Sequence, residues 1–208
     1  MSVKCFFIEP SETVIRYYRR YESGNCQNKG EFDYHNSKIL RDEIKVPVSK
    51  GKSETDPRMV HELVDECDIS LFPTHCDKCG FQFTENSKFQ LTSDRLYYSK
   101  EKNDYFSLSN LPPGAMYYAD WMLHENSNLF RGPDGHSLIV ILPNGNPWTI
   151  DGPANNCTEP KDYDHRCWVR HGEVPNITVD KNGNTCAAGA GSIQSGDYHG
   201  FLRNGELT

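Results

Sequence analysis

The spacing of apolar positions predicts a helix near the N-terminus. Between Ser11 and Tyr21 the apolar residues recur as they do on one face of a helix. This stripe consists of Val14, Tyr17, Tyr18 and Tyr21. Ser11 is a favourable N-cap, so we expect the helix to begin there.

A second helix is expected from Asp56 to near Cys67, because Asp favours the N-cap position and Pro57 the first helical position. Between the two helices, residues 39–48 alternate in the manner of a strand, and a charged loop follows. We therefore expect residues 1–55 to form an N-terminal helix–strand segment, either as a small unit or as part of a single domain. Residues 56–208 then form the main domain.

The second half of the chain is expected to be rich in strands. A run of apolar residues, 138–142, precedes the turn sequence Asn144-Gly145, and residues 148–150 follow it. Asn-Gly readily adopts positive φ, so these segments predict an antiparallel hairpin. Both faces of its first strand are apolar, and we expect burial on both sides. The fold class that follows is α+β, with N-terminal helices packed on a mainly antiparallel β-sheet.

The composition narrows the classes of function. The chain has 208 residues and a formal net charge of −7. This charge argues against a dedicated nucleic-acid-binding protein, because binding to phosphates depends on Lys and Arg. The apolar stretch after Met1 is too short for a signal peptide, and no run approaches the ~18 apolar residues of a membrane span. We expect a cytoplasmic protein whose cysteines stay reduced.

Residues 75–81 contain the most specific motif. Cys76 and Cys79 are separated by two residues and are followed by Gly80 and Phe81. This is the spacing of a zinc knuckle, in which both thiolates bind one ion and the glycine lets the backbone turn around it. The alternatives are a redox-active disulfide and a pair of unrelated buried thiols. No βαβ pattern surrounds the motif to favour the disulfide.

A structural zinc ion needs four ligands, so the rest of the chain must supply two more. We expect Cys157 and Cys167, because the turn-rich segment between them can bring both to one point. Other candidates for these positions are Cys67, His75, Cys186, His165 and His171. Cys5 and Cys26 show no ligand spacing and are expected to be free thiols.

The C-terminal half also holds the residues best suited to carry a reaction. They are Asp151, Cys157, His165, His171 and Cys186. Aspartate, histidine and cysteine can act together as orienting group, base and nucleophile. The same cysteines and histidines can instead bind a structural metal ion, which is the first interpretation of such clusters.

Several segments of this half resemble small uncharacterised proteins of tailed phages and prophages. They are residues 111–117 (LPPGAMY), 132–135 (GPDG), 148–152 (WTIDG), 165–172 (HRCWVRHG) and 185–193 (TCAAGAGSI). The stretch from Cys167 to Gly172 is also distantly similar to a metal-binding family encoded beside bacterial ubiquitin-like conjugation genes. The second resemblance implies a zinc-dependent role in protein modification or its removal. The chain lacks the His-Glu-x-x-His motif of many zinc peptidases.

Three functions are compatible with these features. The first is a zinc-stabilised phage accessory protein that acts as a protein-interaction module, with a host or phage protein as its partner. The second is a zinc- or cysteine-dependent hydrolase or transferase with its site in the C-terminal half. The third is a structural component of the virion, which would expose a large apolar patch. A phage-encoded protein would act in the host cytoplasm, and neither a membrane nor a nucleic acid is expected as its partner.

Overall fold

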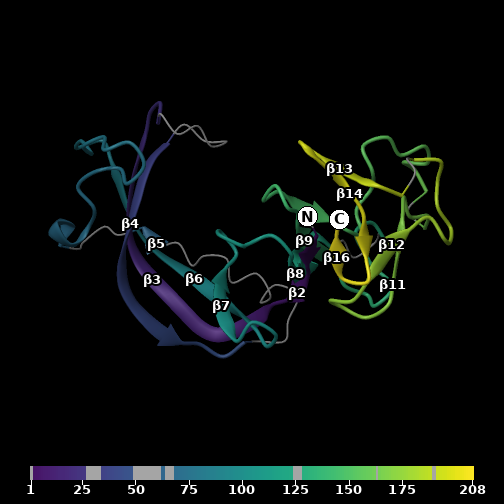
Figure 1. The fold of residues 1–208 in the computed structure, drawn as a ribbon. Helices are drawn as coiled ribbons and strands as arrows, with labels where there is room; N and C mark the ends of the chain where they lie inside the picture. The colour runs from purple at the N-terminus through teal and green to yellow at the C-terminus, as the bar shows by residue number, and fades with distance from the viewer. Residues whose placement is uncertain are drawn as a thin grey trace. The chain divides into compact units, whose positions relative to one another are not determined.

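The structure is a computed structural model that describes residues 2–26, 34–48, 62–63, 68–123, 128–162, 164–188 and 191–208. Of these residues, 45% lie in strands and 3% in helical turns, and no helix among them reaches 7 residues. The α+β class expected from the sequence is therefore wrong, because the described chain is nearly all β (Figure 1). No helix in the described ranges is long and apolar enough to cross a membrane.

The elements in chain order are β1 (Val3–Lys4), β2 (Phe6–Phe7), β3 (Glu9–Ser23), β4 (Tyr34–Lys45), β5 (Glu62–Leu63), η1 (Ile69–Leu71), β6 (Lys88–Ser99), β7 (Asp104–Ser107), β8 (Ala115–Tyr118), η2 (Asp120–Met122), β9 (Leu138–Ile141), β10 (Pro147–Thr149), β11 (Val169–His171), β12 (Thr178–Asp180), β13 (Ile193–Ser195), β14 (Tyr198–Gly200), β15 (Leu202–Arg203) and β16 (Glu206–Leu207). The η elements are single turns of 3-10 helix.

The chain divides into two compact units, each made from separate stretches of sequence. The first unit contains residues 2–10 and the described part of residues 97–208. The second unit contains the described parts of residues 11–48 and 62–96. The boundary expected between residues 55 and 56 lies outside the described residues.

The second unit is built on a sheet with the strand order β4-β3-β6-β5. β3 occupies the segment in which the first helix was expected, so that prediction is wrong. Cross-strand pairs favour the strand: Arg16 forms an ion pair with Asp42, and the ring of Tyr21 packs edge-on against Tyr34. The second expected helix lies mostly outside the described residues, and within it Glu62–Leu63 pairs with β6 as β5.

The first unit contains the expected hairpin at the centre of its core. Its main sheet has the order β10-β9-β8-β2, and Trp148 of β10 lies opposite Val140 of β9. All of β9 is buried. Leu138 and Val140 belong to one apolar cluster, and Ile139 and Ile141 to another. The hairpin and the burial of both faces of its first strand are thus confirmed. A sheet β1-β16-β15 and the hairpins β11-β12 and β13-β14 complete this unit.

Candidate metal centres

Two groups of three cysteines and one histidine gather in the described chain. The first group, here the knuckle centre, consists of Cys26, His35, Cys76 and Cys79. The second group, the C-terminal centre, consists of Cys157, His165, Cys167 and Cys186. In each centre the potential ligand atoms all lie within 4.8 Å of one another. The described cysteines are all free thiols.

The turn around Gly80 presents two cysteines of the knuckle centre. Gly80 has φ +74°, a conformation that residues with a Cβ rarely adopt. Its N–H donates to the carbonyl of Cys76 over 2.9 Å, and the N–H of Cys76 donates to the carbonyl of Phe81 over 2.8 Å. The chain therefore reverses between Cys76 and Phe81, and Cys79 lies on the same tight turn.

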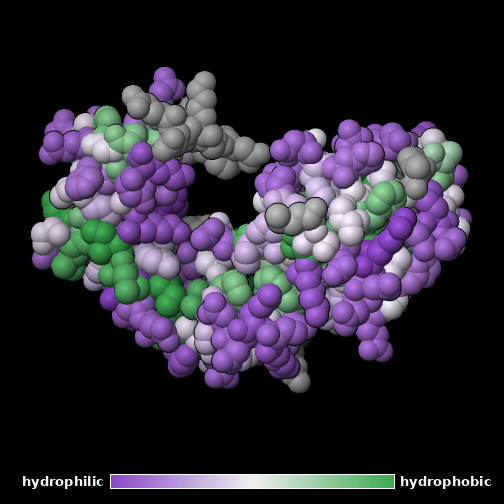
Figure 2. Space-filling model, viewed as in Figure 1, coloured by the Kyte–Doolittle hydropathy of each residue, from purple (hydrophilic) through white to green (hydrophobic). Residues whose placement is uncertain are grey.

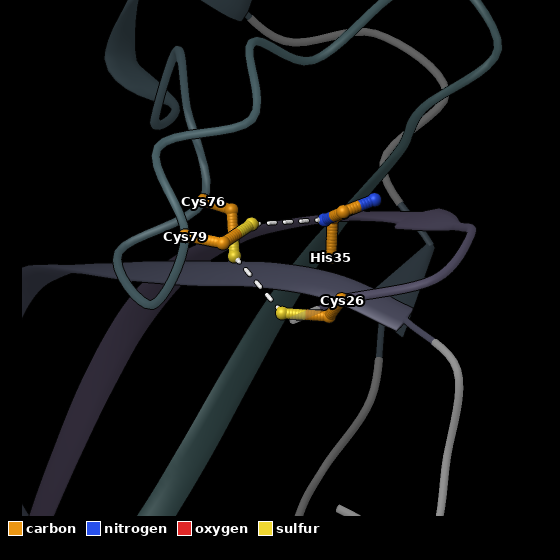
Figure 3. A group of neighbouring side chains, drawn as sticks. All are labelled: Cys26, His35, Cys76 and Cys79. Carbon is orange, nitrogen blue, oxygen red and sulfur yellow. Dashed lines mark hydrogen bonds between the residues drawn. The ribbon is translucent and has the colours of Figure 1, made fainter. Parts of the chain in front are cut away.

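The hairpin of β3 and β4 supplies the other two residues. Cys26 follows the end of β3, and His35 lies near the start of β4. His35 Nδ1 is 3.3 Å from Cys79 Sγ, and Cys26 Sγ is 4.0 Å from Cys76 Sγ (Figure 3). The His35 ring stacks on Phe81 with ring centroids 3.9 Å apart, which fixes the plane of the imidazole.

The C-terminal centre gathers its side chains from separate loops. Cys157 Sγ is 3.2 Å from His165 Nε2, and Cys167 Sγ is 3.9 Å from the same nitrogen. Cys186 Sγ lies 3.7 Å from Cys167 Sγ. The other ring nitrogen of His165 contacts the carbonyl of Asp162. A carbonyl partner on the far nitrogen is the usual arrangement for a metal-binding histidine, and it directs Nε2 toward the sulfur atoms.

These separations fit a metal ion and not a disulfide. Tetrahedral zinc, with bonds of about 2.3 Å to sulfur and about 2.0 Å to nitrogen, places neighbouring ligand atoms roughly 3.6–3.8 Å apart. The sulfur pairs are 4.0 Å apart in the knuckle centre and 3.7 Å apart in the C-terminal centre. A disulfide would need about 2.05 Å.

The local backbone changes the acidity of the thiols. Burial raises the pKa of Cys76, but hydrogen bonds with the backbone, first that of Asn36, lower it more, to about 6. Burial likewise raises the pKa of Cys186, and hydrogen bonds with the backbone, first that of Thr158, lower it to about 6. Burial raises the pKa of Cys167 to about 12. Each centre therefore has at least one thiol that readily ionises, and the thiolate is the form that binds metal.

The residues expected as ligands divide between the two centres. Cys76 and Cys79 lie in the knuckle centre, whereas Cys157 and Cys167 lie in the C-terminal centre. Each expected pair is therefore half of its own group. The sequence analysis placed both pairs on one ion, whereas in the structure each pair belongs to a separate group of potential ligands.

The open candidates for the remaining positions have different locations. His165 and Cys186 complete the C-terminal centre. His75 and His171 lie outside the two centres, and each has a ring nitrogen 2.9 Å from a neighbouring side-chain oxygen. Cys67 lies outside the described residues.

Sequence reasoning missed Cys26 and His35 as members of the knuckle centre. Cys26 was expected to be a free thiol, and its distance along the chain from His35 is too long for a recognisable motif. The register of β3 and β4 places His35 opposite Glu22, so the hairpin brings His35 close to Cys26, which follows the end of β3. If residues 11–21 had been predicted as a strand that pairs with β4, Cys26 and His35 would have been expected to lie close together.

Asp151, the expected orienting group of a catalytic set, has other partners. Its carboxylate accepts from Arg170 Nε at 2.9 Å and 3.2 Å, and from the N–H of Leu138 at 3.0 Å. Arg170 also pairs with Asp134. Burial raises the pKa of Asp151, and the Arg170 guanidinium offsets this only in part. These contacts give Asp151 a structural role in joining β9 to β11.

A pocket of about 570 Å³ borders the C-terminal centre. Its lining includes Phe130, Pro153, Cys157, His165 and Cys167. Cys157 is the least buried member of its centre, and it lines this pocket together with His165 and Cys167.

The described chain is thus nearly all β and contains two groups of three cysteines and one histidine, each of which fits a metal ion. Comparisons with protein-family models, curated proteins and solved structures give no match.

Proposed function

We propose that the protein is a zinc-stabilised accessory protein of a tailed phage that binds another protein, from the host or from the phage. The observation that carries the proposal is the pair of complete centres, each with four protein side chains. Four protein ligands fill the coordination of tetrahedral zinc, as in structural sites. Thiolate and imidazole ligands favour zinc over magnesium or calcium.

A metal ion in each centre would join segments that are far apart in sequence. In the knuckle centre it would tie the β3–β4 hairpin to the turn at Cys76 and Cys79. In the C-terminal centre it would tie three loops together. This cross-linking is what a structural metal contributes, because binding energy becomes folding energy.

The second unit has an apolar surface that supports a binding role. The large apolar side chains that stand exposed there include Ile39 (46%), Leu40 (62%), Ile69 (65%) and Leu71 (45%). Figure 2 shows apolar side chains gathered over the part of this unit where Figure 1 draws β4. β4 is the last strand of the described sheet, and exposed apolar groups on a sheet edge favour contact with another protein. The phage origin rests on the resemblance of segments within residues 111–193.

The test combines metal content with partner binding. Elemental analysis of the purified protein is expected to give about two zinc ions per chain. The zinc-loaded protein is then used to isolate partners from a bacterial host extract, and each is purified to measure its affinity. Leu40→Glu should weaken a true partner at least about tenfold, whereas the matched variant Tyr105→Glu, exposed in the first unit, should not.

Two results would contradict this proposal. A protein without bound metal, in preparations free of chelator, would remove its basis. Partners that bind Leu40→Glu and Tyr105→Glu equally well would show that the apolar surface of the second unit is not the binding site.

A second candidate, a hydrolase or transferase, is supported by the pocket beside the C-terminal centre. If Cys157 left the metal, a water molecule could take its place facing the pocket, as in catalytic zinc sites. A cobalt-substituted C-terminal centre whose absorption changes with pH would favour this candidate, because a water bound to the metal ionises. A metal ion held by three cysteines and one histidine has no bound water.

A further inference from the structure

We infer that Lys181 is a positioning residue of the C-terminal centre, which holds the backbone around two metal-binding cysteines in the arrangement that the metal needs. The inference rests on the proposed metal binding by this centre. Lys181 is not itself a ligand, and no pattern of cysteines or histidines in the sequence indicates its role.

The ammonium group of Lys181 is surrounded by backbone carbonyls of the centre. Lys181 directly follows β12, and its Nζ donates to the carbonyl of Cys167, to that of Cys186 over 2.8 Å and to that of Ala188 over 2.9 Å. An ammonium group has three donors and no acceptor, so these three carbonyls fill its hydrogen-bonding capacity. Two of them belong to proposed metal ligands.

These contacts hold the tripeptide 186–188 at both ends. Between the two anchored carbonyls, the N–H of Ala187 donates to Thr158 Oγ1 over 3.1 Å. The N–H of Ala188 donates to Cys186 Sγ over 3.4 Å. By fixing the carbonyls of Cys186 and Ala188, Lys181 keeps this N–H directed at the sulfur atom. Such a donor stabilises the thiolate that binds the metal.

The charge of Lys181 acts in the same direction. Three thiolates exceed the charge of one divalent ion, so a metal centre of this composition is negative. A neighbouring ammonium group offsets that charge, and its effect is larger in a half-buried position than in open water. Lys181 therefore favours the metal-bound centre both by geometry and by charge.

The two centres in one chain provide an internal comparison. In the knuckle centre, the described contacts that hold the ligands include the Gly80 turn, the stack of His35 on Phe81 and the contact of Cys76 Sγ with the backbone carbonyl of Asn36. A change at Lys181 should therefore affect the C-terminal centre selectively.

The test uses Lys181→Met in the full chain, with Lys161→Met as the matched control, because Lys161 is an exposed lysine of the same unit. Zinc-loaded protein is exposed to rising concentrations of EDTA and alkylated briefly with iodoacetamide. Mass spectrometry then reads the labelling of each cysteine separately. Cys76 and Cys79 report on the knuckle centre, and Cys167 and Cys186 on the C-terminal centre.

In Lys181→Met, we expect Cys167 and Cys186 to become labelled at an EDTA concentration about 10–100-fold lower, the usual effect of losing a residue that supports metal ligands. The labelling of Cys76 and Cys79 should not change, and Lys161→Met should behave as the unaltered protein. Equal EDTA midpoints for Cys167 and Cys186 in Lys181→Met and in the unaltered protein overturn the inference.

Cys5 controls for unfolding, because it is buried in the apolar core of the same unit. If Lys181→Met exposes Cys5 without chelator, Lys181→Arg replaces it. Arginine keeps the charge, but its planar donors cannot reproduce three convergent bonds. An intermediate midpoint then supports the inference, and an unchanged one overturns it. If the unaltered protein shows no EDTA-dependent protection at either centre, the proposed metal binding itself fails, which is a separate result.

Discussion

The two units keep their strands together in different ways. In the first unit, β9 lies between two apolar clusters, and Leu138, Val140 and Leu142 are 0% exposed. In the second unit, the described apolar cluster consists of Cys26, Cys76 and Phe83, with Cys79 and Phe81 packed against it. Three of these five residues belong to the knuckle centre. The knuckle centre therefore makes up most of this cluster, while Phe72, which is 2% exposed, lies outside it and packs against Tyr18 and Phe89.

The C-terminal centre has a different relation to its unit. Cys167, Cys186 and Ala188 form a small cluster of their own, and Trp168 packs against both this cluster and the main core. The main apolar core of the first unit thus contains none of the four residues of the C-terminal centre. A small unit with little apolar burial depends more on a bound metal than a larger one does, because burial supplies most of the folding energy.

Metal removal is expected to produce the largest difference in stability between the two units. With EDTA, the backbone amides of β3 and β4 should lose protection against hydrogen exchange, and those of β8 and β9 should keep it. A structural zinc ion contributes roughly 10 kcal/mol of folding energy in small domains, as much as the whole stability of many proteins. Hydrogen exchange read by mass spectrometry measures both units in one sample.

Restoring zinc is the control, and it should return protection to β3 and β4. Retained protection there, in protein that elemental analysis shows to be metal-free, would mean that the strands of the second unit are stable without the knuckle centre.

The sequence predicted the features that short segments determine. The hairpin of β9 and β10 depends on one apolar run, one Asn-Gly turn and one returning strand, all within residues 138–150. The turn at Cys76 and Cys79 depends on the two cysteines and Gly80. In both places the residues that decide the structure are neighbours in sequence.

The sequence did not predict features that depend on distant partners. The stripe of Val14, Tyr17, Tyr18 and Tyr21 suits a helix, but aromatic and β-branched residues pack equally well on a sheet, and the partner strand decides between them. β4 provides that partner through the pairs from Thr13 with Lys45 to Ser23 with Tyr34. His35 could not be assigned to a metal centre until this pairing was known.

A substitution in the core of the first unit should unfold that unit and leave the second unit folded. Val140→Asp would place an unpaired charge at a position that is 0% exposed, at a cost of about 4 kcal/mol or more. Amides of β8 and β9 should then exchange freely, while Cys76 and Cys79 stay protected from alkylation by zinc. The matched variant Val48→Asp, 37% exposed, should change stability by less than about 0.5 kcal/mol. An unaltered melting temperature for Val140→Asp would contradict the assignment of β9 to the core.

The smallest expected effect comes from a pair of glycines with the same local geometry in different units. Gly80 has φ +74° and Gly145 has φ +84°, and an added Cβ would meet no atom within 4 Å at either position. Alanine should therefore cost only the strain of a left-handed backbone, about 1 kcal/mol at each site. Because the two glycines lie in different turns, the same strain should change a different property of the protein at each site. At Gly80 it opposes the turn that presents Cys76 and Cys79, so zinc affinity of the knuckle centre should fall about fivefold.

At Gly145 the same strain opposes the turn between β9 and β10, so Gly145→Ala should lower the melting temperature of the first unit and leave both zinc affinities unchanged. EDTA titration with cysteine-resolved alkylation measures the affinities, and hydrogen exchange of β9 measures the stability. An equal loss of knuckle affinity in Gly80→Ala and Gly145→Ala would show that the knuckle centre responds to the stability of the whole chain. A loss confined to Gly80→Ala would show that the local turn at Cys76 and Cys79 sets the affinity.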